Sequence, residues 1–108
     1  MSWINLSSLD QLTDIKSESF NKLVIIFKHS TRCSISKMVL SRFEREYDLT
    51  KSSSYFLDLL NHRDISDQIS SDFDVKHESP QLLILKDGQC VVHASHNSIN
   101  HTNPIDFI

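Results

Sequence analysis

The chain has 108 residues, of which 39% are hydrophobic and 23% charged, and its net charge is −3 at pH 7. This length suits a single core, and we expect one domain over residues 1–108. A negative net charge argues against nucleic acid or an anionic membrane as a partner. The longest apolar run has five residues, far fewer than the roughly 20 that a membrane helix needs.

The numbers of cysteines and glycines limit which compartment and which cofactors we expect for this protein. Two cysteines, Cys33 and Cys90, are too few for the disulfide framework of a small secreted protein. Residues 1–5 carry neither the basic flank nor the long apolar segment of a signal peptide, so we expect a cytoplasmic protein. Gly88 is the only glycine, which excludes the glycine-rich loops that bind nucleotides. We expect no bound cofactor.

The first half of the chain predicts two helices and two strands. Residues 7–10, Ser-Ser-Leu-Asp, resemble a capping box before a short helix. Leu23–His29 is apolar without alternation, as in a strand that is buried on both faces. An apolar stripe at spacings of three and four predicts a helix over 34–47; it consists of Ile35, Met38, Val39, Phe43 and Tyr47. Residues 54–58 predict a second short strand.

The second half predicts a further helix, a hairpin and a final helix. Asn61 and Asp64 can cap a helix whose apolar residues are Ile65, Ile69 and Phe73. Residues 82–85 predict a third, fully buried strand. Asp87-Gly88 supplies the positive φ angles of a tight turn before a returning strand over 91–95. Residues 97–108 predict a last helix, broken at Pro104.

The element order α-β-α-β-α-β-β-α indicates an α/β fold. A right-handed strand–helix–strand crossover makes the first two strands parallel, and the hairpin completes a four-stranded mixed sheet flanked by helices. Periodicity alone leaves other α/β folds open. The positions of Cys33 and Pro80 favour the thioredoxin-like arrangement.

Cys33 lies between the first strand and the following helix, where thiol-redox sites occur. Unpaired N–H groups and the helix dipole stabilise the thiolate of a cysteine at a helix N-terminus, and the thiolate is the form that attacks disulfides. Arg32 and Lys37 add positive charge, and the hydroxyls of Ser34 and Ser36 can donate to the sulfur. The alternative is an inert buried cysteine, which needs no polar, basic rim.

Ser36 occupies the position that would complete a C-x-x-C pair, so a redox site here would work with one thiol. Pro80 precedes the third strand, where its missing N–H costs little. In an antiparallel arrangement that end of the strand lies beside Cys33. A cis Ser79–Pro80 bond there would leave a backbone edge open to pair with an incoming substrate chain.

The other cysteine and the histidines have plainer interpretations. Cys90 lies in the hairpin, and at roughly 3.3 Å per residue we expect it about 15 Å from Cys33, too far for a disulfide. We interpret it as a small apolar strand residue. His77, His93 and His101 do not complete a ligand set, so we expect no metal site. His96 is expected near Cys33, where it would tune the thiolate, contact a substrate anion, or serve only as a capping or surface residue.

Two segments resemble a known family. Residues 27–36, Phe-Lys-His-Ser-Thr-Arg-Cys-Ser-Ile-Ser, are similar to the active-site segment of the monothiol bacilliredoxins, the YtxJ-like thioredoxin-fold proteins, where the cysteine sits in T-C-P-I-S. Residues 77–81, His-Glu-Ser-Pro-Gln, and the later Gly88 and 93–96 are also similar. The resemblance covers essentially the whole chain. Ser34 departs from it by replacing the proline after the cysteine, and Arg32 stands directly before Cys33.

The resemblance implies a monothiol disulfide oxidoreductase. Cys33, the predicted catalytic residue, would attack a mixed disulfide between a protein and a low-molecular-weight thiol such as bacillithiol, and would keep the small thiol. A second small thiol or an external reductase would then release it. The partners are therefore S-thiolated proteins and a small thiol. The residues predicted to tune the thiolate or to bind substrate are Thr31, Arg32, Ser34, Ser36, Ser79, Pro80 and His96.

Two other functions remain open on the sequence. The first is a thioredoxin-like binding module with altered catalysis, which the substitution at Ser34 suggests. The second is another thiol enzyme on the same fold, such as an arsenate reductase or a peroxidase. Those enzymes usually need a resolving cysteine or a positioned proton donor, and the sequence offers neither clearly.

Overall fold

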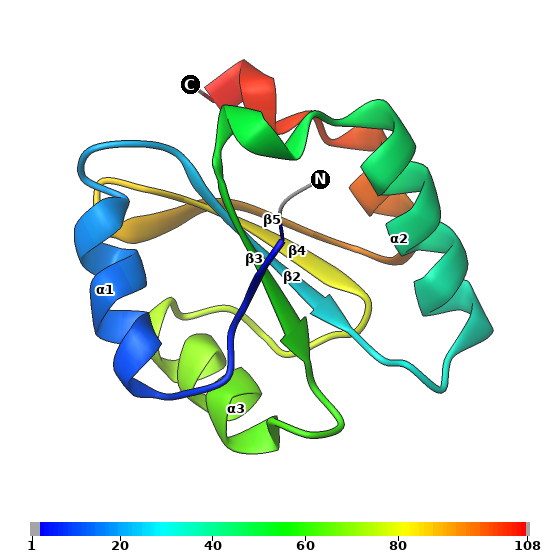
Figure 1. The fold of residues 1–108 in the computed structure, drawn as a ribbon, viewed down its shortest axis with the longest axis horizontal. Helices are drawn as coiled ribbons and strands as arrows, with labels where there is room; N and C mark the ends of the chain where they lie inside the picture. Colours follow the sequence, from blue (N-terminus) through cyan, green and yellow to red (C-terminus); the bar gives the residue numbers. More distant parts are fainter. Residues whose placement is uncertain (1–2, 108) are drawn as a thin grey trace.

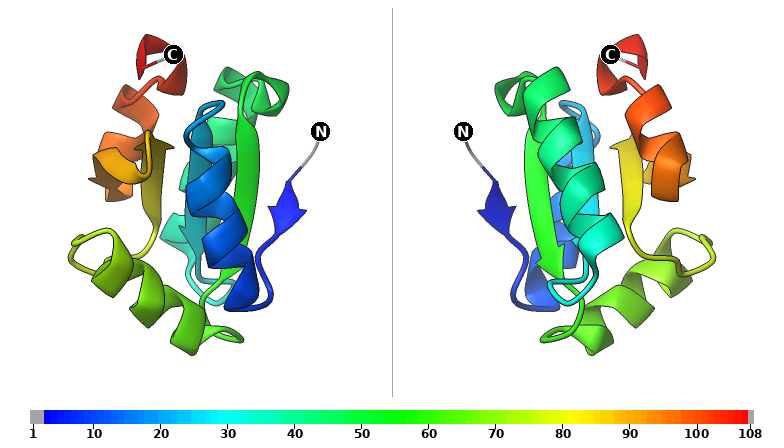
Figure 2. Two further views of the ribbon diagram at one scale, coloured as in Figure 1. Left: turned by 90° about the vertical axis from the view of Figure 1, so that its left-hand side faces the viewer. Right: turned by 90° about the vertical axis from the view of Figure 1, so that its right-hand side faces the viewer.

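A mixed five-stranded sheet, with strand order β1-β3-β2-β4-β5, forms the centre of the computed structural model (Figure 1). The structure describes residues 3–107, so residues 1, 2 and 108 of the predicted domain lie outside it. Two helices, α1 (Asp10–Glu18) and α3 (Arg63–Asp72), cover one face of the sheet. The other face carries α2 (Ser34–Glu46) and the C-terminal segment (Figure 2).

The central strand is β2 (Val24–His29), and all six of its residues are buried. It runs parallel to β3 (Ser53–Asp58) and antiparallel to β4 (Gln81–Lys86), which pairs antiparallel with β5 (Gln89–Ser95). Neighbouring strands and helices on both faces explain the unbroken apolar run that the sequence shows. The predicted thioredoxin-like mixed sheet is therefore confirmed.

The predicted number of strands is wrong, because β1 (Ile4–Asn5) adds a fifth strand at the edge. It pairs in parallel with β3, and the next residue, Leu6, donates its N–H to Phe56 O at 2.9 Å. Both residues of β1 are exposed. Two exposed residues show no alternation, which is why the pattern did not indicate a strand.

The ends of the helices also differ from the prediction. The N-cap of α3 is His62 and not Asn61, whose amide instead donates to Asp58 Oδ2 at 2.8 Å. The prediction of a last α-helix over 97–108 is wrong. The described part of this segment forms two 3₁₀ helices, His96–His101 and Pro104–Phe107, and the helical structure is interrupted just before the proline. Within residues 3–107, no helix is long and apolar enough to cross a membrane.

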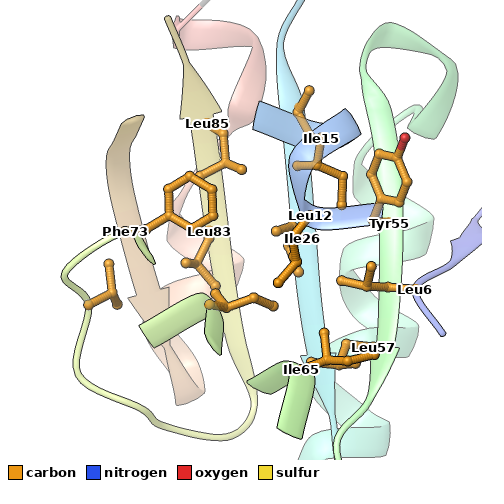
Figure 3. Close-up of a cluster of buried hydrophobic side chains, with 13 residues drawn as sticks. Leu6, Leu12, Ile15, Ile26, Tyr55, Leu57, Ile65, Phe73, Leu83 and Leu85 are labelled. Carbon is orange, nitrogen blue, oxygen red and sulfur yellow. The ribbon is translucent and has the colours of Figure 1, made fainter. Parts of the chain in front are cut away.

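Two hydrophobic clusters fill the space on either side of the sheet. Figure 3 shows the cluster between the sheet and α1 and α3, which includes Leu12, Ile15, Ile26, Ile65 and Leu83. The side chains of β2 alternate, since Val24 and Ile26 point to this cluster and Ile25 and Phe27 to the one under α2. The same alternation directs Lys28 toward α3 and His29 toward α2.

Candidate active site at the N-terminus of α2

Cys33 is the N-cap residue of α2, with extended backbone angles of φ −105° and ψ 118°. Its N–H donates to Ser30 O at 3.2 Å, and its carbonyl accepts from Lys37 N at 3.1 Å, which starts the helix. An N-cap side chain normally accepts the free N–H groups of the first turn. No side chain caps α2, and its first turn holds no acidic residue. The N–H groups of the first turn of α2 therefore have no side-chain acceptor at the end of the helix where Cys33 lies.

Ser36 lies one turn further on and is fully buried. Its hydroxyl oxygen accepts from Ser30 N at 3.2 Å and lies 2.8 Å from His29 Nδ1. Because the oxygen accepts from Ser30, its own proton can go to Nδ1, which places the imidazole proton on Nε2. Burial lowers the pKa of His29 and favours this neutral ring. Both contacts direct the hydroxyl toward the strand, and none of its described hydrogen bonds goes to the Cys33 sulfur.

The segment around Pro80 lies beside this site, as the sequence predicted. The Ser79–Pro80 peptide bond is cis. Lys28 pairs with Gln81 across β2 and β4, so the end of β2 that leads to Cys33 is next to Pro80. The Ser79 hydroxyl oxygen is buried without a hydrogen-bond partner in the described chain.

His96 joins the same end of the sheet through its backbone. Its N–H donates to Pro80 O at 3.1 Å, its φ is +53°, and its side chain is exposed. Histidine is one of the residues that enter this left-handed region more often than most. Thr31, Arg32 and Ser34 are exposed to solvent in the loop and first turn around Cys33.

The sequence did not predict a polar cluster on the α3 face of the sheet, behind this site. Lys28 is fully buried, and its Nζ lies 3.3 Å from Ser66 O, 3.4 Å from Ser70 Oγ and 3.4 Å from His77 Nδ1. Burial lowers the pKa of Lys28 from 10.5 to about 8. The signal available in the sequence was Lys28-His29, two polar residues that end an otherwise apolar strand.

Cys90 is separate from the site. Both cysteines are free, and Cys90 pairs with Leu85 near the hairpin end of β5, whereas Ser95 lies at the Pro80 end. The Cys90 thiol donates to Val92 O at 3.1 Å, and burial raises its pKa. It is therefore a poor nucleophile. Among residues 3–107, no three His, Cys, Asp or Glu side chains gather as a metal site.

Cysteine at a helix N-terminus beside a cis-proline, on this sheet, defines a thioredoxin-fold protein with one thiol in its site. The family model described as monothiol bacilliredoxin BrxC matches residues 4–103. The chain thus belongs to the monothiol bacilliredoxin BrxC family, and it is a thiol oxidoreductase of the thioredoxin-like class.

Solved structures agree with this assignment. A proposed oxidoreductase with a thioredoxin fold is 37% identical, with a TM-score of 0.79, and the match covers 90% of this chain and 85% of that one. The thioredoxin Mala s 13 of Malassezia sympodialis is 23% identical, with a TM-score of 0.67 and coverage of 98% and 84%. A thioredoxin of Trypanosoma brucei brucei is 19% identical, with a TM-score of 0.71 and coverage of 93% and 83%. The two thioredoxins support the fold alone.

Proposed function

We propose that this protein removes a low-molecular-weight thiol, bacillithiol or a similar one, from protein mixed disulfides. The Cys33 thiolate attacks the sulfur of the small thiol, a new disulfide forms between them, and the protein leaves as a thiolate that takes a proton from solvent. A second small thiolate then attacks the adduct. It forms a disulfide with the first and returns Cys33 as a thiolate.

The observation that carries the proposal is the single thiol of the site. Ser36 holds the resolving position, and its buried hydroxyl is hydrogen-bonded to Ser30 and His29. Cys90 lies toward the far end of the sheet. Neither residue can release a small thiol from Cys33, so the reaction needs an external one. An external reductase would reduce the disulfide of two small thiols, and a reducing cytoplasm would supply both.

The backbone of Ser79, for which no hydrogen bond to the described chain is found, supports a protein as substrate. Ser79 lies two residues before the first residue of β4, at the end of the sheet where α2 begins. A chain that pairs along this edge would bring its disulfide to Cys33. The exposed Thr31, Arg32 and Ser34 would then contact the substrate or the small thiol.

The test uses one model protein with bacillithiol, and separately glutathione, attached to its cysteine. Each adduct is incubated with wild type, Cys33→Ala or Cys90→Ala, together with the free small thiol, and the released protein thiol is measured by mass. We expect release by wild type and by Cys90→Ala but not by Cys33→Ala, and faster release of bacillithiol. Absence of Cys33-dependent release from both adducts would overturn the proposal in favour of a binding module.

A further inference from the structure

A buried lysine at the end of β2 has no role in the chemistry described above. Lys28 is 0% exposed, and its three hydrogen-bond partners, on Ser66, Ser70 and His77, are all neutral. An ammonium buried without a paired carboxylate destabilises a folded protein, and an apolar side chain of similar size would fit the same place at less cost. Activity can depend on groups that reduce the stability of the fold.

The contact of Lys28 with His77 connects the core of the sheet to the segment 77–80. Ser66 Oγ also lies 3.0 Å from His77 Nδ1, so two groups share this nitrogen. Burial, and then the charge of Lys28, lower the pKa of His77. The ring is therefore neutral, and its Nδ1 lone pair can accept from the ammonium.

The charged groups around the pair come from two elements. Asp67 and Arg63 lie on α3, and Glu78 follows His77 in the segment 77–80. Asp67 opposes the effect of burial on the pKa of Lys28 and of His77, and Arg63 adds to it for His77. None of these groups replaces the neutral partners as hydrogen-bond acceptors of Lys28 Nζ.

Further hydrogen bonds hold the same segment from its two ends and from β5. Gln81 Nε2 donates to Lys76 O at 2.9 Å, and Ser95 Oγ donates to Glu78 Oε2 at 2.6 Å. His96 N donates to Pro80 O at 3.1 Å. Lys28 holds the segment through His77, from the face of the sheet that is opposite to α2.

We propose that Lys28 is a positioning residue for protein substrates, because its hold on His77 fixes the segment 77–80 beside Cys33. The inference deepens the proposed function and rests on it. Lys28 does not touch the thiol, so reactions of Cys33 with small reagents do not depend on it. Loss of Lys28 therefore weakens only the binding of a substrate chain that pairs along the segment 77–80.

The experiment compares Lys28→Met and His77→Leu with two controls. His77→Asn retains a polar side-chain atom close to the position of Nδ1, and Lys22→Met removes an exposed lysine. For each variant, kcat and KM are measured with the bacillithiolated model protein, and the alkylation rate of Cys33 is measured with iodoacetamide.

We expect Lys28→Met and His77→Leu to raise KM about ten-fold, as the loss of a charge-assisted hydrogen bond would, with kcat and alkylation within about two-fold of wild type. His77→Asn and Lys22→Met should keep the wild-type KM. An unchanged KM in Lys28→Met overturns the proposal. A fall in alkylation as large as the rise in KM overturns it too, because it shows a general disturbance of the fold.

Hydrogen exchange separates this proposal from the proposed function. The amide of His96, bonded to Pro80 O, reports how firmly the segment 77–80 is held. It should exchange about ten-fold faster in Lys28→Met than in wild type, while amides of β2 stay unchanged. If wild type releases no small thiol, the function fails, and this exchange rate still decides the role of Lys28: an unchanged rate rejects it.

Discussion

Replacing Lys28 by methionine should make the protein more stable at neutral pH. The side chain is fully buried, and burial lowers its pKa from 10.5 to about 8. At pH 7 the lysine is charged in both the folded and the unfolded chain, so the folded state carries the cost of burying the charge. Methionine fills a similar space without that charge.

The size of the effect follows from the pKa. A change from 10.5 to about 8 corresponds to about 3 to 4 kcal/mol, at roughly 1.4 kcal/mol per pH unit. Relaxation of the protein around the buried charge reduces this to about 2 kcal/mol. The three hydrogen bonds of Nζ are 3.3 to 3.4 Å long, and their loss offsets little of this gain.

The pH dependence gives the sharper test. Between pH 8 and 10.5 the unfolded chain keeps the Lys28 proton and the folded chain does not, so the stability of wild type rises with pH from this group. Cys90, Tyr47 and Tyr55 have raised pKa values, that of Tyr55 about 12, and they lower stability in alkali. Because they act equally in both proteins, the difference between wild type and Lys28→Met isolates the lysine.

Urea unfolding of both proteins at several pH values between 7 and 10 measures that difference. We expect an advantage of about 2 kcal/mol for Lys28→Met at pH 7 that shrinks toward zero near pH 10. A constant difference across this range would show that the lysine does not lose its proton on folding. If Lys28→Met is less stable than wild type at pH 7, the buried charge of Lys28 does not destabilise the fold.

Three other changes probe the site and the turn. Burial lowers the pKa of His29 and His77, so as pH falls below 6.5 the unfolded chain takes up their protons first and stability is lost; a urea midpoint unchanged from pH 7 to 5.5 would contradict this. Ser36→Cys should form a disulfide with Cys33 and expel a bound small thiol without a second one, which intact mass will show; a persistent adduct argues against it. Gly88→Ala should lower the free energy of unfolding by about 1 kcal/mol, because φ is +80° and alanine is strained there; an unchanged melting temperature would refute that.

Local signals in the sequence were enough to predict the centre of the site. Cys33 follows an apolar strand and begins an amphipathic helix, and both boundaries are visible in the residue pattern. Pro80 stands directly before the last buried strand. Once the strand order is known, the pairing of β2 with β4 brings these residues to one end of the sheet.

The features that the sequence did not predict depend on contacts between distant residues. The hydroxyl of Ser36 can face the sulfur or the strand, and the neighbouring His29 decides between them. The partners of Lys28, Ser66 and His77, are 38 and 49 residues away along the chain. Nothing in their local sequence marks them as neighbours, because only the packing of α3 against the sheet brings them together.

Intact mass shows whether Cys33 works as a single thiol. The chain is mixed with a bacillithiolated protein in the absence of free small thiol, quenched with acid, and weighed before and after proteolysis. We predict one small thiol per chain, attached to Cys33, with Cys90 still free. A chain without the adduct, or one that has lost it by forming a Cys33–Cys90 disulfide, would show that Cys33 does not work as a single thiol.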